Sequence, residues 1–214
     1  MIRSESEARA WLAEHPECGE QTWAKLKRFL EMLAIENERQ NLVSASSLSE
    51  FWRRHVVDSA QLLASVPRGT SPWLDLGTGA GFPGLVAAVF RPEMPITLVE
   101  SRRKRVDWLK GASESLELTN VHIADTRLEL VPTTRFAVIS ARAFAPLERL
   151  LALSVRFSTS DTIWLLPKGR SAQTELDSLE GWTHTFHVEP SLTDNEAGVI
   201  VGNMLGRAQK GLRT

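Results

Sequence analysis

The sequence has one cysteine, Cys18, and no run of apolar residues long enough to cross a membrane. A single cysteine excludes an internal disulfide and a cysteine-rich metal site. A membrane-spanning helix would need about 20 consecutive apolar residues, and the first residues also lack the apolar core of a signal peptide. We therefore expect a cytoplasmic protein with no membrane contact and no bound metal.

An excess of charge of one sign is also missing. The 25 Lys and Arg residues and 26 Asp and Glu residues give a formal net charge of −1, so RNA binding would need a local basic patch. With 43% apolar and 24% charged residues, the 214-residue chain can bury a full core. We expect a monomer with a helical cap over residues 1–70 and an α/β domain over residues 71–214.

The cap is predicted from helical spacing. Apolar residues recur on one face of residues 23–34, a loop is expected over 41–47, and a second helix over 47–65. His55 and Asp58 lie one turn apart in that helix, with no further metal ligands nearby in the sequence. We interpret them as a hydrogen-bonded pair that docks the cap on the sheet.

From Trp73 onward, strand and helix patterns alternate. The expected strands are 73–76, 96–99, 120–123, 135–140 and 161–166, and the expected helices are 83–90, 102–116, 146–157 and 171–179. Short connections between alternating elements predict a parallel sheet covered on both faces. Two later strands, 184–188 and 198–202, have no helix between them and predict an antiparallel end. The expected fold class is therefore α/β, with a Rossmann-like, mostly parallel sheet and an antiparallel last strand.

The strongest functional pattern is the turn after the first of these strands. Asp75 stands near the end of the strand, and Gly77, Gly79 and Gly81 follow before the next helix. Glycines allow positive φ and close approach of the backbone to a ligand. Glu100 ends the next strand, about 20 residues further on, where an acid binds ribose hydroxyls. This arrangement predicts a nucleotide-type cofactor site.

Residues 79–84 also match the G-x-G-x-x-G pattern of a dinucleotide dehydrogenase. Against that alternative, the glycines already begin at Gly77, and little chain is left for a second mononucleotide half or a substrate domain. The order Asp75-x-Gly77-x-Gly79-x-Gly81, with Glu100 after the next strand, resembles the S-adenosylmethionine site of Rossmann-type methyltransferases.

A closer resemblance covers roughly residues 25–170. It rests on Asn41-Leu42, Arg54-His55-Val56-Val57-Asp58-Ser59, Leu74–Gly84, Val99-Glu100-Ser101, Arg142-Ala143-Phe144 and Lys168-Gly169. These motifs resemble the RsmG (GidB) family, which methylates guanine N7 in small-subunit (16S) ribosomal RNA. The resemblance implies a class I methyltransferase sheet, S-adenosylmethionine as cofactor, and ribosomal RNA or the assembled 30S subunit as partner.

The resemblance also implies five cofactor contacts: Gly77, Phe82, Leu128, Glu129 and Arg142. By pattern alone, Leu128 would be a core residue. The chain departs from the family before the last strand, where Asp194-Asn195-Glu196 replaces a basic pair. The basic residues that could take over that role are in the tail: Arg207, Lys210 and Arg213.

Further absences bear on the chemistry. Methylation of a pyrimidine carbon needs a cysteine nucleophile, and Cys18 lies in the cap. Exocyclic amines commonly require an Asn/Asp-Pro-Pro-Tyr or Phe loop, whereas this chain has neither tyrosine nor adjacent prolines. Guanine N7 carries a free lone pair and needs no general base, so positioning and electrostatics suffice. The sequence is therefore compatible with N7 chemistry.

Arg142 is the predicted catalytic residue. It follows the fourth strand at the edge where α/β sheets bind ligands, and its guanidinium can grip a carboxylate or the O6/N7 edge of guanine. The alternative is a surface ion pair with Glu148 or Glu129.

Four basic residues are predicted to bind RNA phosphates: Arg102, Arg103, Arg105 and Lys168. The alternative for the arginines is a solvated helix end capped by Ser101. Two other functions stay open at this point: a non-catalytic RNA-binding module and a small-molecule methyltransferase.

Overall fold

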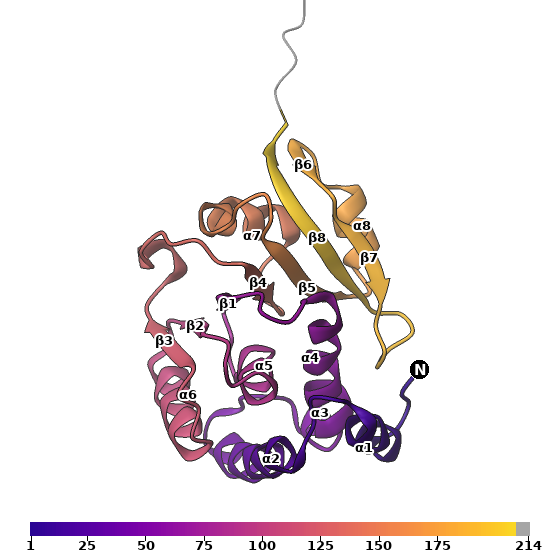
Figure 1. The fold of residues 1–214 in the computed structure, drawn as a ribbon, viewed down its shortest axis with the longest axis vertical. Helices are drawn as coiled ribbons and strands as arrows, with labels where there is room; N and C mark the ends of the chain where they lie inside the picture. Colours follow the sequence, from indigo (N-terminus) through magenta and orange to yellow (C-terminus); the bar gives the residue numbers. More distant parts are fainter. Residues whose placement is uncertain (209–214) are drawn as a thin grey trace, which may run out of the picture.

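One sheet of eight strands organises residues 1–208, which the computed structural model describes (Figure 1). Its order is β3-β2-β1-β4-β5-β8-β6, and β7 also pairs with β8. The strands are β1 (Trp73–Leu76), β2 (Ile96–Glu100), β3 (Val121–Asp125), β4 (Val138–Ala141), β5 (Ile163–Gly169), β6 (Trp182–His184), β7 (His187–Pro190) and β8 (Gly198–Arg207).

Strands β1 to β5 are parallel, and β8 runs antiparallel to β5, which confirms the predicted fold class. The predicted strand 184–188 is wrong in detail. It is two short strands, β6 and β7, which both pair with β8, so β8 lies inside the sheet next to β5. Lys210 and Arg213, two of the predicted tail contacts, lie outside the described residues.

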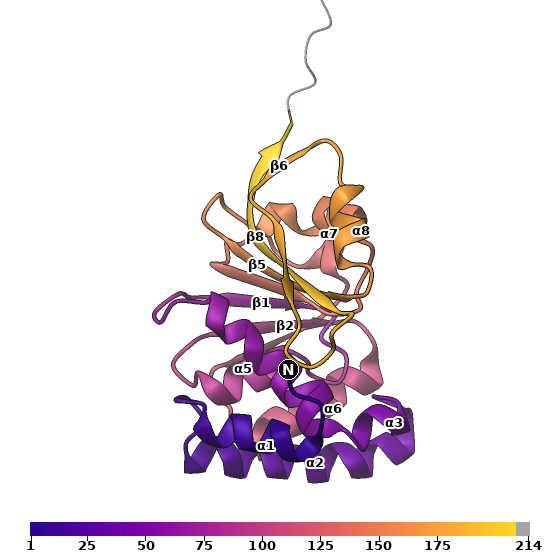
Figure 2. The same ribbon diagram turned by 90° about the vertical axis from the view of Figure 1, so that its right-hand side faces the viewer.

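Helices cover both faces of the sheet. They are α1 (Glu5–Glu14), α2 (Glu20–Gln40), α3 (Ala45–Leu48), the π-helix η1 (Trp52–Val57), α4 (Asp58–Ala60), η2 (Gln61–Ser65), α5 (Gly84–Phe90), α6 (Arg103–Ser115), η3 (Leu128–Leu130), α7 (Leu147–Ser154), η4 (Val155–Phe157) and α8 (Ala172–Asp177). Figure 2 shows α5 and α6 on one side of the sheet with α1 and α2 outside them, and α7 and α8 on the other side. None of the helices among residues 1–208 has the length and apolar character needed to span a bilayer.

The predicted helix over 47–65 begins later than expected, and its hydrogen-bonding pattern changes along its length. After the separate α3, residues 51–65 are helical without a break and include η1, α4 and η2. Ser44 caps α3 by accepting the Ser47 amide, which places a short helix in the predicted loop. Glu5 accepts the amides of Trp52 and Arg53 at the start of η1, at 3.2 and 2.8 Å. A contact from a residue this far away in the sequence cannot be read from local spacing.

The cap and the sheet share one hydrophobic core, to which α1, α2 and η1 contribute together with α5, α6, β1 and β2. The buried Arg91 guanidinium at the end of α5 reinforces the junction by binding Glu17 and the Leu63 and Val66 carbonyls. The division at residue 70 stays a prediction, because the packing is continuous across it. The tryptophans expected in the core are buried: Trp52, Trp73, Trp108 and Trp164.

Candidate functional site

The turn after β1 has the backbone geometry that its glycines predict. Gly77, Gly79 and Gly81 have φ of 61°, 60° and 106°, which side chains with a Cβ rarely adopt. The Thr78 amide donates to the Val99 carbonyl of β2 at 3.2 Å, so the turn is fixed to the neighbouring strand. The turn lies at the carboxyl end of the sheet, where parallel α/β sheets bind ligands, and Gly77 and Gly79 are its partly exposed residues.

Asp75 supports this turn from beneath. Its carboxylate accepts hydrogen bonds from the Ser140 hydroxyl at 2.6 Å and the Gly84 amide at 3.1 Å, and Ser140 in turn accepts from the Trp73 indole at 2.8 Å. A Cβ at Gly84 would clash with Leu98, so only glycine fits between α5 and the sheet. Complete burial raises the pKa of Asp75 to about 6, against the hydrogen bonds that lower it. Asp75 is thus a structural support of the turn, with no exposed atom to offer a cofactor.

Phe82 links the turn to the cap. Phe82 is 2% exposed, and its ring stacks on His55, with 4.6 Å between centroids, and lies tilted against Phe29 at 5.2 Å. The Arg142 guanidinium lies 5.0 Å from the centre of the same ring. On the other side, the Trp108 indole donates to the Ala80 carbonyl at 3.0 Å. Phe82 is therefore buried between the turn and the cap, and its ring closes that junction.

Glu100 ends β2 beside the turn, as predicted, and is buried. It accepts the amides of Ser101 and Arg102 at 2.8 and 2.9 Å, and Arg105 lies 3.8 Å away. Arg105 also approaches Gly79, since a Cβ built there would be 3.5 Å from its Nη1. Arg105 therefore lies over the cofactor turn, between Gly79 and Glu100.

The neighbouring arginines have different surroundings. Arg102 is exposed and occupies the N-cap position of α6, so the proposed Ser101 cap is wrong. Among the residues that the structure describes, no side chain caps α6, and the Glu100 carboxylate accepts the two amides that precede the helix. Arg103 is 73% exposed and pairs with Asp107 and Asp125, at 3.2 and 3.4 Å.

Leu128 and Glu129 form a short 3-10 turn after β3. The Leu128 side chain is buried in the core, while its carbonyl accepts from Arg156, and Glu129 is exposed. The turn lies along the same sheet edge as Glu100, because β2 and β3 are adjacent and parallel. Any contact of Leu128 with a cofactor would be made by its backbone.

Arg142 follows β4 directly, as predicted, but its partners come from the cap. Its Nη1 donates to the Arg54 carbonyl at 3.2 Å and lies 3.4 Å from the Asp58 carboxylate, and its Nη2 lies 3.3 Å from His55 Nδ1. The alternative, an ion pair with Glu148 or Glu129, is not what Arg142 forms, because its carboxylate partner is Asp58. Likewise, His55 and Asp58 each bind Arg142 in place of the expected direct bond between them, and in this way they dock the cap on the sheet.

His55 is neutral in this arrangement. Burial, together with the Arg142 and Arg54 guanidiniums, lowers its pKa to about 3. Nδ1 therefore accepts from Arg142, and the proton is on Nε2, which is buried without a partner in the described residues. A neutral imidazole can stack on Phe82 and accept a hydrogen bond, but it is a weak base near neutral pH.

A cavity of about 940 Å³ opens next to Arg142, between the cap, the β4–α7 connection and the starts of α8 and β8. Arg54, His55, Asp58, Phe144 and Lys168 are among its lining residues. Phe144 also covers the turn, since a Cβ built at Gly77 would be 2.5 Å from its ring. Phe144 therefore stands between the cavity, which it lines, and the predicted cofactor turn.

Lys168, predicted to bind phosphate, is only 8% exposed. Its ammonium donates to the Ala145 carbonyl at 2.6 Å and pairs with Glu175 at 2.9 Å. The structure thus brings together the turn, Glu100, Arg105 and Arg142, and places Lys168 inside the cavity wall.

Sequence reasoning missed the role of Ser140 and the convergence of Arg54 with Arg142. The Arg-His-x-x-Asp spacing indicated the helical segment that contributes to the site, but the partner of these residues, Arg142, is 84 to 88 residues away in the sequence.

The fold and the site define a Rossmann-like protein of the class I methyltransferase type. A solved structure of an S-adenosylmethionine-dependent methyltransferase from Aquifex aeolicus matches with a TM-score of 0.57 and 14% identity, covering 76% of this chain and 99% of that one. The likeness is one of fold.

The family described as rRNA small subunit methyltransferase G (GidB) matches residues 22–194. Two proteins named ribosomal RNA small subunit methyltransferase G are close relatives. That of Erythrobacter litoralis is 54% identical over 98% of this chain and 100% of its own length. That of Novosphingobium aromaticivorans is 53% identical over 96% of this chain and 91% of its own length. The chain belongs to this family, which confirms the resemblance drawn from its motifs and removes the dehydrogenase alternative.

Proposed function

We propose that the protein is an S-adenosylmethionine-dependent methyltransferase that modifies N7 of a guanine in small-subunit ribosomal RNA. The observation that carries the proposal is the position of Arg142. Its guanidinium lies over Phe82 of the cofactor turn and also lines the adjacent cavity. This position supports a role for Arg142 between the cofactor and the target base.

The residues present fit the cofactor. Gly77 and Gly79 have positive φ and are only partly buried, and the Leu128–Glu129 turn on the same sheet edge would contact adenine. One oxygen of the buried Glu100 carboxylate accepts two amides, and the other, Oε2, would accept ribose hydroxyls. S-adenosylmethionine supplies an electrophilic methyl group on a sulfonium. This chain's own contribution is to hold the guanine in line with that group and to orient its O6/N7 edge, which is the role proposed for Arg142.

The cavity favours a target atom that needs no deprotonation. His55, with a pKa of about 3, is a poor base. Asp58 is engaged by Arg142, Gln61 and Thr193. Although partial burial opposes it, hydrogen bonds from Ser171, Lys168 and Leu147 lower the pKa of Glu175. Guanine N7 has a free lone pair at neutral pH, so these surroundings suit it.

Of the four basic residues predicted to bind RNA, we retain Arg102 and Arg103 as phosphate contacts, because both are exposed at the rim beside the cofactor turn. We assign Arg105 to the cofactor side and Lys168 to the support of the cavity wall. The monomeric state and the choice between free RNA and the 30S subunit also stay predictions. Light scattering of the purified protein and a comparison of the two substrates test them.

The decisive experiment uses a labelled methyl donor with 30S subunits, or naked 16S RNA, from a strain that lacks this protein. Borohydride and aniline then cleave the RNA at N7-methylguanine. We expect labelled RNA, cleaved at a defined guanine, with wild-type protein and neither result with Gly79→Val. Labelled RNA without cleavage would refute N7 as the target. RNA binding without methyl transfer would favour a non-catalytic RNA-binding module. Label found only in small molecules would favour a small-molecule methyltransferase.

A further inference from the structure

We infer that Arg54 forms a phosphodiester-binding subsite in the wall of the 940 Å³ cavity, for the RNA backbone next to the target guanine. The identity of the ligand rests on the proposed function. The existence of an anion subsite rests on the charges and contacts of the wall itself.

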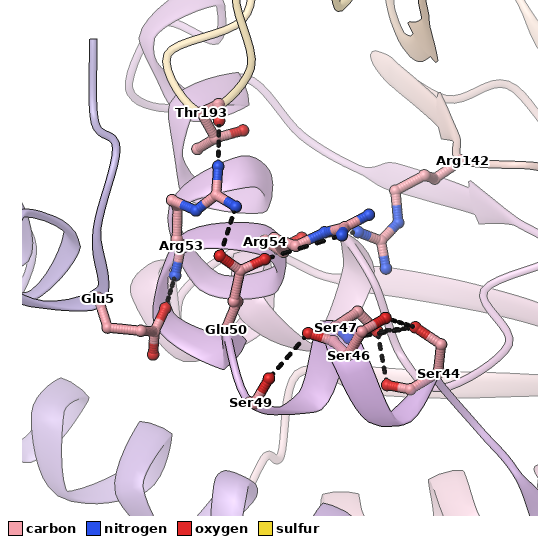
Figure 3. Close-up of polar contacts among 10 residues, drawn as sticks. All are labelled: Glu5, Ser44, Ser46, Ser47, Ser49, Glu50, Arg53, Arg54, Arg142 and Thr193. Carbon is pink, nitrogen blue, oxygen red and sulfur yellow. Dashed lines mark hydrogen bonds and ion pairs between the residues drawn. The ribbon is translucent and has the colours of Figure 1, made fainter.

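The wall around η1 carries more cations than anions. Glu50 pairs with Arg53 and Arg54 (Figure 3), and Asp58 pairs with Arg142, so three arginines share two carboxylates. Glu50 lies 2.6 Å from Arg53 but 3.8 Å from Arg54, and Asp58 lies 3.4 Å from Arg142. Each carboxylate therefore has a nearer partner than Arg54, which leaves one positive charge without a close counter-ion in this wall.

Arg54 is also the most available of the three arginines. Its side chain is 50% exposed, compared with 19% for Arg53 and 24% for Arg142. The Arg53 guanidinium donates to the Thr193 carbonyl at 2.7 Å, and Arg142 is held by the cap. Within residues 1–208, the Arg54 guanidinium makes the long contact with Glu50 and no hydrogen bond. Its planar guanidinium can therefore donate two parallel hydrogen bonds to one phosphate.

The position of Arg54 connects such a phosphate to the reaction. The Arg54 carbonyl accepts from Arg142, so the two residues are joined at the mouth of the cavity. Both guanidiniums also act on His55, whose pKa they lower in addition to burial. Like charges that act on the same imidazole also repel each other, and an anion bound beside them reduces that repulsion. A phosphate at Arg54 would thus place its base beside Arg142.

The serine-rich turn on the same side does not offer a competing neutral site. The Ser44 hydroxyl bonds Ser46 and Ser47, and the Ser47 hydroxyl donates to the Ser44 carbonyl. These hydroxyls are used inside the turn that they shape (Figure 3). Charge is therefore the property by which this part of the cavity selects its ligand.

The test measures RNA affinity against salt concentration, with 16S RNA from a strain that lacks the protein. Arg54→Gln should raise Kd and reduce the slope of log K against log salt by about 0.7–0.9, the contribution of one phosphate contact. Arg54→Lys keeps the charge and should keep most of the slope. Arg68→Gln is the matched control, because Arg68 is 71% exposed, precedes β1 at the opposite end of the strands, and pairs with Glu17.

Calorimetry with S-adenosylhomocysteine separates the two sources of an anion, RNA phosphate and the carboxylate of the cofactor. We expect equal affinity in wild type and Arg54→Gln, with unchanged melting because Arg54 is half exposed. An unchanged salt slope overturns the inference, and so does a loss confined to cofactor affinity. If the wild type neither binds nor methylates the RNA, the proposed function fails. If the wild type is active and Arg54→Gln is indistinguishable from it, only this inference fails.

Discussion

Replacing Arg142 with alanine separates its structural contribution from its catalytic one. Its ion pair with Asp58 is 3.4 Å long and partly exposed, which limits its contribution to about 1 kcal/mol. Its position over the Phe82 ring adds about 0.5–1 kcal/mol, and its contacts to the cap are long. We therefore expect the free energy of unfolding to fall by about 1–2 kcal/mol, which corresponds to a Tm lower by about 2–8 °C.

A loss of stability of this size leaves the protein folded at the assay temperature, so a fall in turnover would report on catalysis. If Arg142 orients guanine, kcat of Arg142→Ala stays at least tenfold down, about 1.4 kcal/mol, even at saturating S-adenosylmethionine. Lysine should restore little, because a point charge cannot reproduce the planar fork. The assay follows methyl transfer to ribosomal RNA over a range of cofactor concentrations, with Arg149→Ala on the exposed side of α7 as control. Recovery of full turnover at saturation would make Arg142 a cofactor clamp only. Full activity at all concentrations would remove it from the mechanism.

Three further predictions concern the turn and its surroundings. Gly79→Val should weaken S-adenosylhomocysteine binding more than tenfold in calorimetry, because φ is 60° there, and equal binding would refute the assigned turn. Replacing Arg102 and Arg103 with glutamine should flatten the salt dependence of RNA binding, whereas Arg105→Gln should change cofactor affinity; the reverse pattern would exchange their roles. Burial raises the pKa of Asp75 from 3.8 to about 6, so the folded state keeps a proton that the unfolded chain has released. Stability should therefore fall as the pH rises from about 4 to about 6, and urea unfolding should show this slope in wild type but not in Asp75→Asn.

Much of the sheet and the cofactor turn follows from the sequence, because their signals are local. Asp75, the glycines and Glu100 mark the ends of adjacent parallel strands, and parallel strands bring their carboxyl ends to one edge. The position of Arg142 follows for the same reason. The parallel direction of the first five strands also follows, since short crossovers between alternating elements allow few arrangements, whereas the place of β8 inside the sheet does not.

The remainder depends on contacts between distant segments. Spacing placed His55 and Asp58 on one helix face, but it could not reveal that Arg142 would be their partner. Nor could a run of basic residues show which of them are neutralised. Lys168 is paired with Glu175 across the β5–α8 connection, whereas Arg105 reaches back to Glu100. Basic residues that look alike in the sequence differ in the structure, because the fold gives each one different acidic neighbours.

The cap is, in this structure, part of the site. Among residues 1–208, the polar side-chain contacts of Arg142 are with η1 and Asp58. The start of η1 is in turn fixed by Glu5, whose carboxylate accepts two of its first amides. The Ile2 amide further ties the first residues to the Leu192 carbonyl, in the loop that carries Thr193 to Arg53. Without these helices, the guanidinium would lose its counter-ion and its hydrogen-bond acceptors, and the Phe82 ring would lose its cover. The glycine turn alone could still bind a cofactor, but the Arg142 guanidinium, which we propose orients the guanine, would no longer be held in place.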